Sequence, residues 1–482
     1  MSKNILIFSD GTGQAGGLRP DQRLSNIYKL FRASRVAPDN IIDPKEQIAF
    51  YDAGLGTDET STGNIYIKIK KSFDKYLGSI TGRGITTNIT DCYEAILNHY
   101  EPGDRIFLFG FSRGAYTVRC VARVLSLCGV PTENGQGEVL PLFTSETRKI
   151  ADEAVRKVYE HGAGRDRQIF EEEREEKARR FREKYHSGIN NEQTPEFDHA
   201  NASPYFIGVF DTVASLGARG LRRLGMAIMA IITLVVITTS LAKILASFFE
   251  WDFWSTVVLV SLMIIAAMFR VALKSSFKII SNYPEKNSFR FHFAKWKMKN
   301  YDRGLDTRVR YARHALAIDE TRKDFSRVQW GFKGSDYSRS EGEPTGLVQL
   351  WFAGNHSDIG GSYPENESRL SDITLEWMLS EARSLPHPLI VNESMLNLFP
   401  SADAMQHCEV ESLRDVYPNW FPNFLRYTWP EKFRYDASGA PYHPTVHERL
   451  VLPSIIKHGR STLYRPESLK YDPKLENFYQ KS

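Results

Sequence analysis

Residues 106–114 read Ile-Phe-Leu-Phe-Gly-Phe-Ser-Arg-Gly. Four apolar residues come directly before the first glycine, and helix-forming residues follow the second, from Ala115 to Leu127. This order predicts a buried strand, a tight turn and a helix, the setting in which a G-x-S-x-G turn raises its serine above the edge of a sheet. We therefore expect Ser112 at the carboxyl end of a strand, where the amino end of the next helix offers backbone N–H groups.

Apolar strands and amphipathic helices alternate on both sides of this turn. The predicted strands are residues 5–8, 47–51, 205–210 and 347–352, and the predicted helices are residues 25–33, 85–100 and 371–383. Alternation of this kind predicts an α/β fold with a mostly parallel sheet and helices on both of its faces.

Length, net charge and cysteine content limit what kind of protein this is. A length of 482 residues exceeds what one compact core usually holds, so we expect one large domain with insertions, or two domains. The net charge of +4 is too small to indicate nucleic-acid binding. The 4 cysteines form no C-x-x-C pair and no metal-binding spacing, which is typical of free thiols in a reducing compartment.

Residues 144–187 are dominated by Glu, Arg and Lys, as in the run Glu-Glu-Glu-Arg-Glu-Glu-Lys at 171–177. This composition predicts one long, solvent-exposed helix with many salt bridges, inserted at the periphery of the domain.

Two apolar segments lie in the middle of the chain. Residues 224–242 and 253–269 carry no charged side chain, and each is near the ~20 residues that cross a bilayer as a helix. We predict an inserted helical hairpin that anchors the protein in a membrane. A pair of buried core helices or an apolar lid is the alternative. The predicted α/β domain is then split into 1–217 and 281–482, with the hairpin region at 218–280.

Basic residues flank the hairpin at both of its outer ends. They are Arg219, Arg222 and Arg223 before it, and Arg270, Lys274 and Lys278 after it. Because positively charged flanks stay in the cytosol, we expect the catalytic body on the cytoplasmic side of the membrane.

Acyl transfer by a serine needs a base that takes the hydroxyl proton and an acidic group that orients the base. Ser112, Asp211 and His356 each follow a predicted apolar strand, in the chain order that α/β-hydrolases use. The carboxyl ends of parallel strands gather at one edge of a sheet. We therefore predict a triad in which Ser112 attacks a carbonyl, His356 carries the proton and Asp211 orients the imidazole.

Each of these partners has an alternative. Asp211 could cap a helix, and Asp358 could orient a histidine. His443 is the main rival of His356 as the catalytic base. His443 and His447 stand four residues apart but lack the glutamate of H-E-x-x-H, so no zinc site is predicted there. The sequence implies no cofactor and no metal.

An oxyanion hole has to accompany the triad. The backbone N–H of Arg113, directly after the serine, is the expected first donor. Gly11 and Thr12, at the end of the first strand, are the candidates for the second donor. Asp10-Gly11-Thr12 also suggests the D-x-D-G-T motif of aspartyl-phosphate enzymes, but Phe8 stands where that motif needs a carboxylate.

Six sequence blocks together resemble a known family. They are Phe8–Thr12, Tyr51–Thr57, Gly110–Tyr116, Gly208–Val213, Ala312–Leu316 and His356–Gly361. In this order they resemble the α/β-hydrolase family of the type VI secretion phospholipase effectors, which also has many uncharacterised bacterial and fungal members. The likeness covers residues 1–130, 204–217 and 300–383 and a fragment near His443.

The resemblance implies an α/β-hydrolase fold, a triad on Ser112, Asp211 and His356, and esterase or phospholipase A activity on membrane lipids or other acyl esters. The apolar hairpin departs from the pattern of a secreted effector, which has to stay soluble until delivery. We therefore expect a resident, membrane-anchored serine hydrolase. Two alternatives stay open: a secreted antibacterial effector with an immunity protein as partner, and a non-enzymatic membrane scaffold with a hydrolase-like body.

Overall fold

The computed structural model describes residues 2–14, 16–17, 23–54, 83–189, 197–213, 220–296, 303–331, 344–418, 420–422 and 426–480. The predicted boundary at 217–218, the flanking Arg219 and the end of the Tyr51–Thr57 block lie outside these residues.

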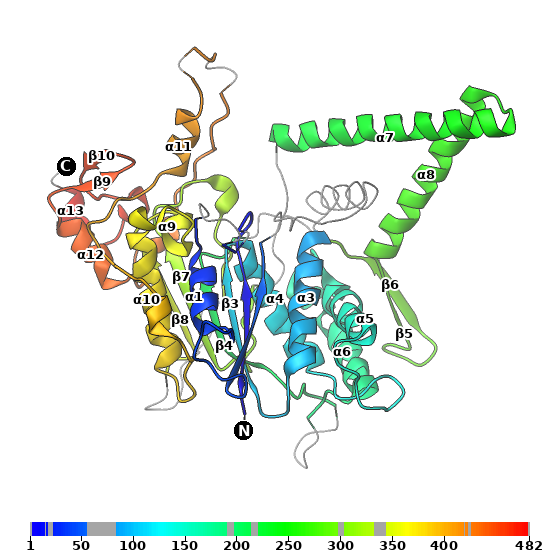
Figure 1. The fold of residues 1–482 in the computed structure, drawn as a ribbon, viewed down its shortest axis with the longest axis horizontal. Helices are drawn as coiled ribbons and strands as arrows, with labels where there is room; N and C mark the ends of the chain where they lie inside the picture. The colour runs from blue at the N-terminus through cyan, green and yellow to red at the C-terminus, as the bar shows by residue number, and fades with distance from the viewer. Residues whose placement is uncertain are drawn as a thin grey trace.

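Parallel strands form the central sheet (Figure 1). In chain order they are β1 (Asn4–Ser9), β2 (Gln47–Asp52), β3 (Arg105–Phe111), β4 (Pro204–Phe210), β7 (Tyr311–Ala317) and β8 (Leu347–Phe352). Their spatial order is β2-β1-β3-β4-β7-β8, and each neighbouring pair is parallel. Strands from before and after the apolar hairpin therefore share one sheet.

Helices cover both faces of this sheet (Figure 1). One face packs against α1 (Asn26–Ser34) and α10 (Arg369–Arg383), and the other packs against α3 (Arg83–His99) and α4 (Arg113–Cys128). The predicted α/β fold, with a mostly parallel sheet and helices on both faces, is confirmed.

Alternation along the strands explains how one sheet supports two cores. In β1, Leu6 and Phe8 belong to the core under α1 and α10, whereas Ile7 belongs to the core under α3 and α4. Phe107 and Leu108 of β3 divide in the same way. Because successive side chains of a strand point to opposite faces, a continuous apolar run is what a strand buried on both faces requires.

The charged segment at 144–187 is not one exposed helix, so that prediction is wrong. It folds as α5 (Ser145–Glu153), a π-helical turn (Ala154–Val158), two short 3₁₀ helices (Tyr159–Gly162 and Arg167–Phe170) and α6 (Glu171–Tyr185).

Charged side chains of this insertion pair with α4 and with one another, and Glu173, Arg174 and Arg182 are buried. Arg123 of α4 pairs with Glu171 at 2.5 Å and with Glu175 at 2.7 Å. Arg182 is buried and donates to the backbone carbonyls of Leu127 and Phe197. A charge-rich sequence therefore builds a packed layer here rather than a solvated helix.

The apolar hairpin consists of α7 (Gly220–Phe249) and α8 (Phe253–Ser276). These helices extend beyond the rest of the chain and join at their outer ends (Figure 1). Within them, Ile231–Phe249 and Phe253–Val271 are long and apolar enough to cross a membrane, by length and composition. Their large side chains face outward, with Phe248 79% and Trp254 71% exposed. The described parts of the hairpin are therefore not core helices.

The remaining elements continue from the hairpin and wrap the end of the sheet. An antiparallel pair, β5 (Phe277–Ser281) and β6 (Phe289–Phe293), directly follows α8. After β8 come α9 (His356–Gly360), α11 (Glu409–Asp415), α12 (Pro444–Val451), β9 (Ile455–Lys457), β10 (Arg460–Thr462) and α13 (Glu476–Tyr479). Apolar side chains of this C-terminal part form a third core with Leu316 and Trp351.

Candidate active site

The strand order reverses direction between β1 and β3. The chain leaves β1 for β2 on one side and then crosses to β3 on the other side. Sites in parallel sheets form at the carboxyl ends of strands where the order reverses. Ser9, the last residue of β1, lies opposite Gly110 in the register, so the loop after β1 meets the Ser112 turn at this point.

Ser112 has the backbone of a strained elbow. Its φ is 59° and its ψ is −120°, a conformation that a non-glycine residue rarely adopts. Its backbone N–H donates to the Phe210 carbonyl at 3.1 Å, which ties the turn to the end of β4. The side chain makes no capping hydrogen bond to α4. The predicted turn is therefore present, with Ser112 between β3 and α4.

The two glycines of the motif are needed for steric reasons. A Cβ on Gly110 would lie 2.6 Å from the Ala115 Cα, and a Cβ on Gly114 would lie 2.0 Å from the Ser9 carbonyl oxygen. The helix after the turn therefore packs directly on the ends of β1 and β3.

Asp211 and His356 meet at this edge of the sheet. His356 Nδ1 lies 2.6 Å from Asp211 Oδ2, and both side chains are buried. Asp211 Oδ1 also accepts a hydrogen bond from the Ala317 backbone N–H at 3.1 Å, at the end of β7. His356 begins α9, whose N-cap Asn355 forms a capping box with Asp358. The C-terminal ends of β4, β7 and β8 thus hold this pair in place.

The imidazole of His356 stacks on Phe111, the residue directly before Ser112, with 4.7 Å between ring centroids. Its Nε2 is buried and has no hydrogen-bond partner in the part of the chain that the structure describes. No hydrogen bond joins Ser112 Oγ to His356 Nε2 among the described residues. Such contacts are often long without substrate and tighten when it binds.

Arg434 is a site residue that the sequence analysis missed. This buried arginine, far along the C-terminal segment, binds both oxygens of Asp211: Nη1 to Oδ1 at 2.6 Å and Nη2 to Oδ2 at 3.1 Å. Burial alone would raise the pKa of the Asp211 carboxyl, but the Arg434 guanidinium and the His356 hydrogen bond outweigh it and hold the pKa well below its usual range. Asp211 is therefore ionised at neutral pH despite complete burial.

The candidate oxyanion-hole residues lie next to the elbow. A Cβ on Gly11 would lie 3.4 Å from the Ser112 Cβ. The Gly11 backbone N–H already donates to Asp10 Oδ1 at 2.7 Å, which the sequence did not reveal. The Arg113 side chain donates to Thr12 Oγ1. No described residue accepts a hydrogen bond from the backbone N–H of Thr12 or Arg113, so these two groups are the better candidates.

Asp10 fixes the loop that carries these donors. It is buried and accepts hydrogen bonds from Ser25 Oγ at 2.5 Å and from the Tyr51 hydroxyl at 2.7 Å. Burial raises the pKa of its carboxyl to about 6, although these hydrogen bonds act in the opposite direction. Asp10 thus has a positioning role in the loop rather than the position of a nucleophile.

His443 and Asp358, the alternative candidates for the triad, have other partners. His443 caps α12, with Nδ1 2.9 Å from Thr445 Oγ1, and its ring stacks on Phe352. No described carboxylate pairs with it. Asp358 contacts His407, 2.8 Å from that ring, and not His356. The structure therefore brings Asp211 together with His356 and not with His443.

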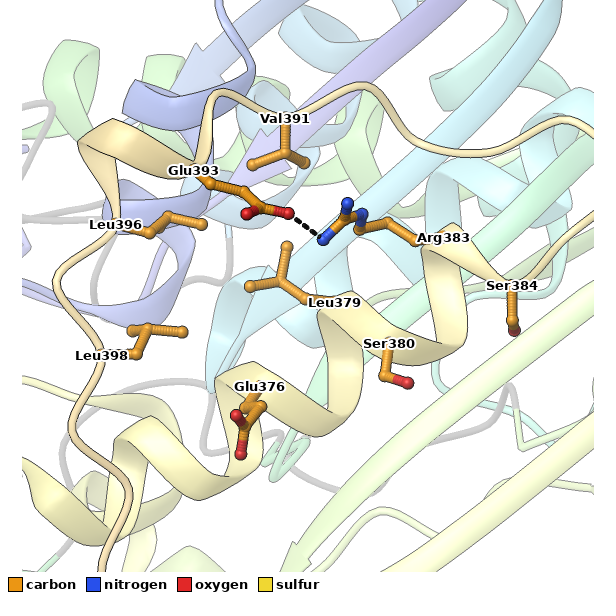
Figure 2. Close-up of a pocket in the computed structure, with 9 residues that line it drawn as sticks. All are labelled: Glu376, Leu379, Ser380, Arg383, Ser384, Val391, Glu393, Leu396 and Leu398. Atoms are coloured by element: carbon orange, nitrogen blue, oxygen red, sulfur yellow. Dashed lines mark ion pairs between the residues drawn. The ribbon is translucent and has the colours of Figure 1, made fainter.

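A separate hollow lies on the outer side of α10 (Figure 2). It has a volume of about 680 Å³ and lies between α10 and residues 391–398. The Arg383–Glu393 ion pair, 2.5 Å long, crosses it. None of the predicted site residues lines it.

Comparison with protein families shows what the chain is related to. Residues 3–381 match the sequence model of one family, the Tle1-like phospholipase effectors of the type VI secretion system (T6SS), catalytic domain. The chain belongs to this family. The Tle1-like match begins at β1 and ends in α10, so it includes Ser112, Asp211 and His356.

Individual relatives of this Tle1-like chain are distant. It is 29% identical over 134 residues to the uncharacterized protein YEL023C of Saccharomyces cerevisiae (strain ATCC 204508 / S288c), a stretch that covers 27% of this chain and 18% of that protein. The aligned part is therefore a small share of that relative's length.

Two solved structures share a low similarity with the chain. One is the crystal structure of an uncharacterized protein from Pseudomonas aeruginosa, with 16% identity and a TM-score of 0.35, which covers 82% of this chain and 47% of that chain. The other is the Tle1 effector bound to the VgrG spike of the type 6 secretion system, with 17% identity and a TM-score of 0.28, which covers 77% of this chain and 53% of that chain. The chain spans about half the length of each.

Proposed function

We propose that this Tle1-like protein is a membrane-associated serine hydrolase that cleaves carboxylic esters of lipids. One observation carries the proposal: His356 Nδ1 lies 2.6 Å from Asp211 Oδ2 at the sheet edge that carries Ser112. A buried imidazole that is oriented by a carboxylate, and whose second nitrogen has no described partner, is equipped to act as a general base.

The proposed reaction has two halves. His356 Nε2 takes the proton from Ser112 Oγ as this oxygen attacks the ester carbonyl carbon. The backbone N–H groups of Thr12 and Arg113 stabilise the resulting oxyanion. Collapse of the tetrahedral intermediate expels the alcohol, which takes the proton from His356 and leaves an acyl group on Ser112. Water then attacks this acyl group with His356 as the base, which releases the carboxylic acid and restores the serine.

The hairpin favours a lipid as the substrate. Residues 214–219 alone separate Val213 from Gly220, so α7 begins no more than about 25 Å from the residues that follow β4. Insertion of α7 and α8 into a bilayer would hold the catalytic edge near the lipid surface, where acyl esters are concentrated. The basic flanks of the hairpin favour a cytoplasmic position for the body.

A secreted antibacterial phospholipase effector is the second candidate, and the family match favours it. This candidate predicts toxicity after delivery into the periplasm of a target cell and neutralisation by an immunity protein. The exposed apolar hairpin favours the resident enzyme, because a soluble protein in transit would expose that surface to water.

Fatty-acid release from phospholipid vesicles tests the proposed function. Full-length protein in mild detergent is reconstituted into vesicles, and free fatty acid is measured by mass spectrometry. We expect hydrolysis by the wild type, loss of about 10⁴-fold or more in Ser112→Ala and His356→Ala, and little change in His443→Ala, the matched control. Wild-type rates in Ser112→Ala, or loss of activity in His443→Ala alone, would contradict the proposal.

A further inference from the structure

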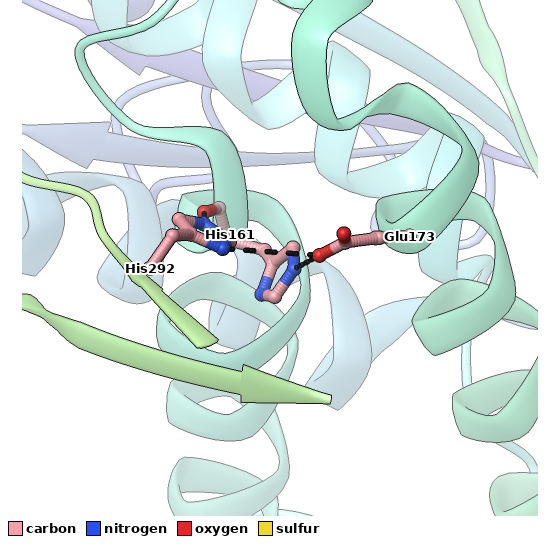
Figure 3. A group of neighbouring side chains, drawn as sticks. All are labelled: His161, Glu173 and His292. Carbon is pink, nitrogen blue, oxygen red and sulfur yellow. Dashed lines mark hydrogen bonds and ion pairs between the residues drawn. The ribbon is translucent and has the colours of Figure 1, made fainter. Parts of the chain in front are cut away.

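Three side chains from different elements converge in one cluster (Figure 3). His161 lies in the short helix Tyr159–Gly162, Glu173 lies in α6, and His292 lies in β6. Each offers one nitrogen or oxygen atom, and these atoms all lie within 4.8 Å of one another. None of these residues belongs to the candidate active site.

The hydrogen bonds around this cluster leave two imidazole nitrogens aimed at one carboxylate oxygen. His161 Nε2 lies 2.7 Å from Glu173 Oε2, and His292 Nδ1 lies 3.8 Å from the same oxygen. The other nitrogen of His292, Nε2, lies 2.7 Å from the His161 backbone carbonyl and donates to it. In a neutral ring, Nδ1 of His292 then carries a lone pair that faces a carboxylate.

His292 shows the pattern of a metal-binding histidine. Such a histidine usually donates its second ring N–H to a carbonyl or carboxylate, which fixes the tautomer and directs the lone pair at the metal. His161 is completely buried, and its Nε2 is the nitrogen that faces Glu173. Its Nδ1 has no hydrogen-bond partner among the described residues, so His292 alone has the second-nitrogen contact of this pattern.

We propose that His161, Glu173 and His292 form a binding site for a zinc ion. Two imidazoles and one carboxylate are a donor set that suits Zn²⁺, whereas Mg²⁺ and Ca²⁺ prefer oxygen atoms alone. Ligand atoms about 2.0–2.1 Å from a tetrahedral zinc ion lie about 3.3 Å apart. The separations of 2.7 Å and 3.8 Å from Glu173 Oε2 bracket this value, and the His161 and His292 nitrogens, which lie within 4.8 Å of each other, would move toward it when zinc binds.

With three protein ligands, the fourth position of a tetrahedral zinc ion would be held by water. The Phe170 ring stacks on His292 with 3.7 Å between centroids and covers one side of the cluster. Arg290 approaches the other oxygen of Glu173, at 3.6 Å, and leaves Oε2 as the ligand atom. A bound zinc ion would tie β6, which follows the second apolar helix, to the charged insertion. It would therefore fix the base of the hairpin to the catalytic body.

Zinc binding to the full-length protein in detergent tests this proposal directly. The protein is stripped with a chelator and dialysed against buffered Zn²⁺, and bound zinc is measured by mass spectrometry. We expect one zinc ion per chain, and binding at least tenfold weaker in His292→Gln. Glutamine retains an N–H donor for the His161 carbonyl but lacks the ring nitrogen. Co²⁺ in place of zinc should give the visible absorption of a four-coordinate site.

His186→Gln is the matched control, because His186 pairs with Glu133 at 3.0 Å and no third metal-ligating side chain joins them among the residues that the structure describes. We expect this variant to bind zinc as the wild type does. Absence of stoichiometric zinc in the wild type would overturn the proposal without reference to any variant. Wild-type affinity in both His292→Gln and Glu173→Gln would also overturn it.

Discussion

At the scale of single residues, the ion pair between Asp211 and Arg434 keeps the proposed triad carboxylate ionised. Completely buried carboxylates are rarely ionised without a paired charge, and Arg434 supplies that charge through two hydrogen bonds. The same guanidinium donates to the Phe325 and Ala317 carbonyls. One side chain of the C-terminal segment therefore connects the proposed acid residue to the loop after β7.

Arg434→Ala should be strongly destabilised at neutral pH, by about 3–5 kcal/mol, because it leaves a buried carboxylate without its partner. The sign of the pH dependence follows from the lowered pKa of Asp211. In the wild type this group contributes stability above its unfolded pKa of about 3.9 and loses it only as the pH falls through the lowered folded pKa. In the variant the folded pKa rises, so protonation relieves the buried charge at a higher pH.

The difference in Tm between wild type and Arg434→Ala should therefore be largest near pH 7 and smaller near pH 4. Thermal unfolding at the two pH values measures it. Arg414→Ala, which removes an exposed arginine paired with Glu431, is the control and should change Tm little at either pH. A Tm difference that grows on acidification would contradict the role given to Arg434.

At the scale of elements, the elbow between β3 and α4 depends on close contacts that only glycine permits. Gly114→Ala would place a Cβ 2.0 Å from the Ser9 carbonyl oxygen, a backbone atom, so α4 and the end of β1 would have to move apart. We expect this variant to lose esterase activity and to unfold at a lower temperature. Gly439→Ala is the control for a general loss of glycine, because a Cβ there meets no atom within 4 Å.

Gly439 has a φ of 74°, so its alanine variant carries only the modest cost of a left-handed backbone. Full esterase activity in Gly114→Ala, measured on a short soluble ester, would show that the turn does not have the geometry described here.

The elements could be predicted from the sequence to the extent that their signal is local. Apolar runs indicated β1, β3 and β4 because strands buried on both faces lack polar alternation. The edge strand β8 was indicated by its apolar residues although it is only partly buried. The helix predicted at residues 25–33 is α1, and Ser25 caps it: its hydroxyl accepts from the Tyr28 N–H at 3.1 Å. The insertion at 144–187 was misjudged because a charge pattern does not show whether Arg182 or Arg123 has a buried partner elsewhere in the chain.

The residues of the candidate site could likewise be predicted only where their signal in the sequence is local. Ser112, Asp211 and His356 could be proposed because each follows an apolar strand, and strand ends converge in a parallel sheet. Arg434, His161 and His292 could not be found in this way. They lie in an irregular segment, a short helix and an edge strand, and their partners are far away in sequence. No sequence motif next to these residues indicates a functional role.

At the scale of the whole molecule, the outward-facing hairpin should determine which substrates the enzyme reaches. Replacement of residues 224–269 by a short Gly-Ser linker removes the apolar surface but leaves the sheet and the predicted triad. We expect a soluble protein that hydrolyses short soluble esters at the wild-type rate but releases fatty acid from vesicles at least tenfold more slowly. The same deletion in Ser112→Ala is the control for hydrolysis by contaminants. Equal vesicle activity with and without the hairpin would count against a role in substrate access.

The proposed function depends on one activated hydroxyl at the edge of the sheet. A fluorophosphonate probe reacts covalently with such a serine, and peptide mass spectrometry locates the adduct. We predict a single adduct on Ser112, which is lost in His356→Ala and retained in His443→Ala. An adduct on another serine, or no adduct on folded full-length protein, would contradict it.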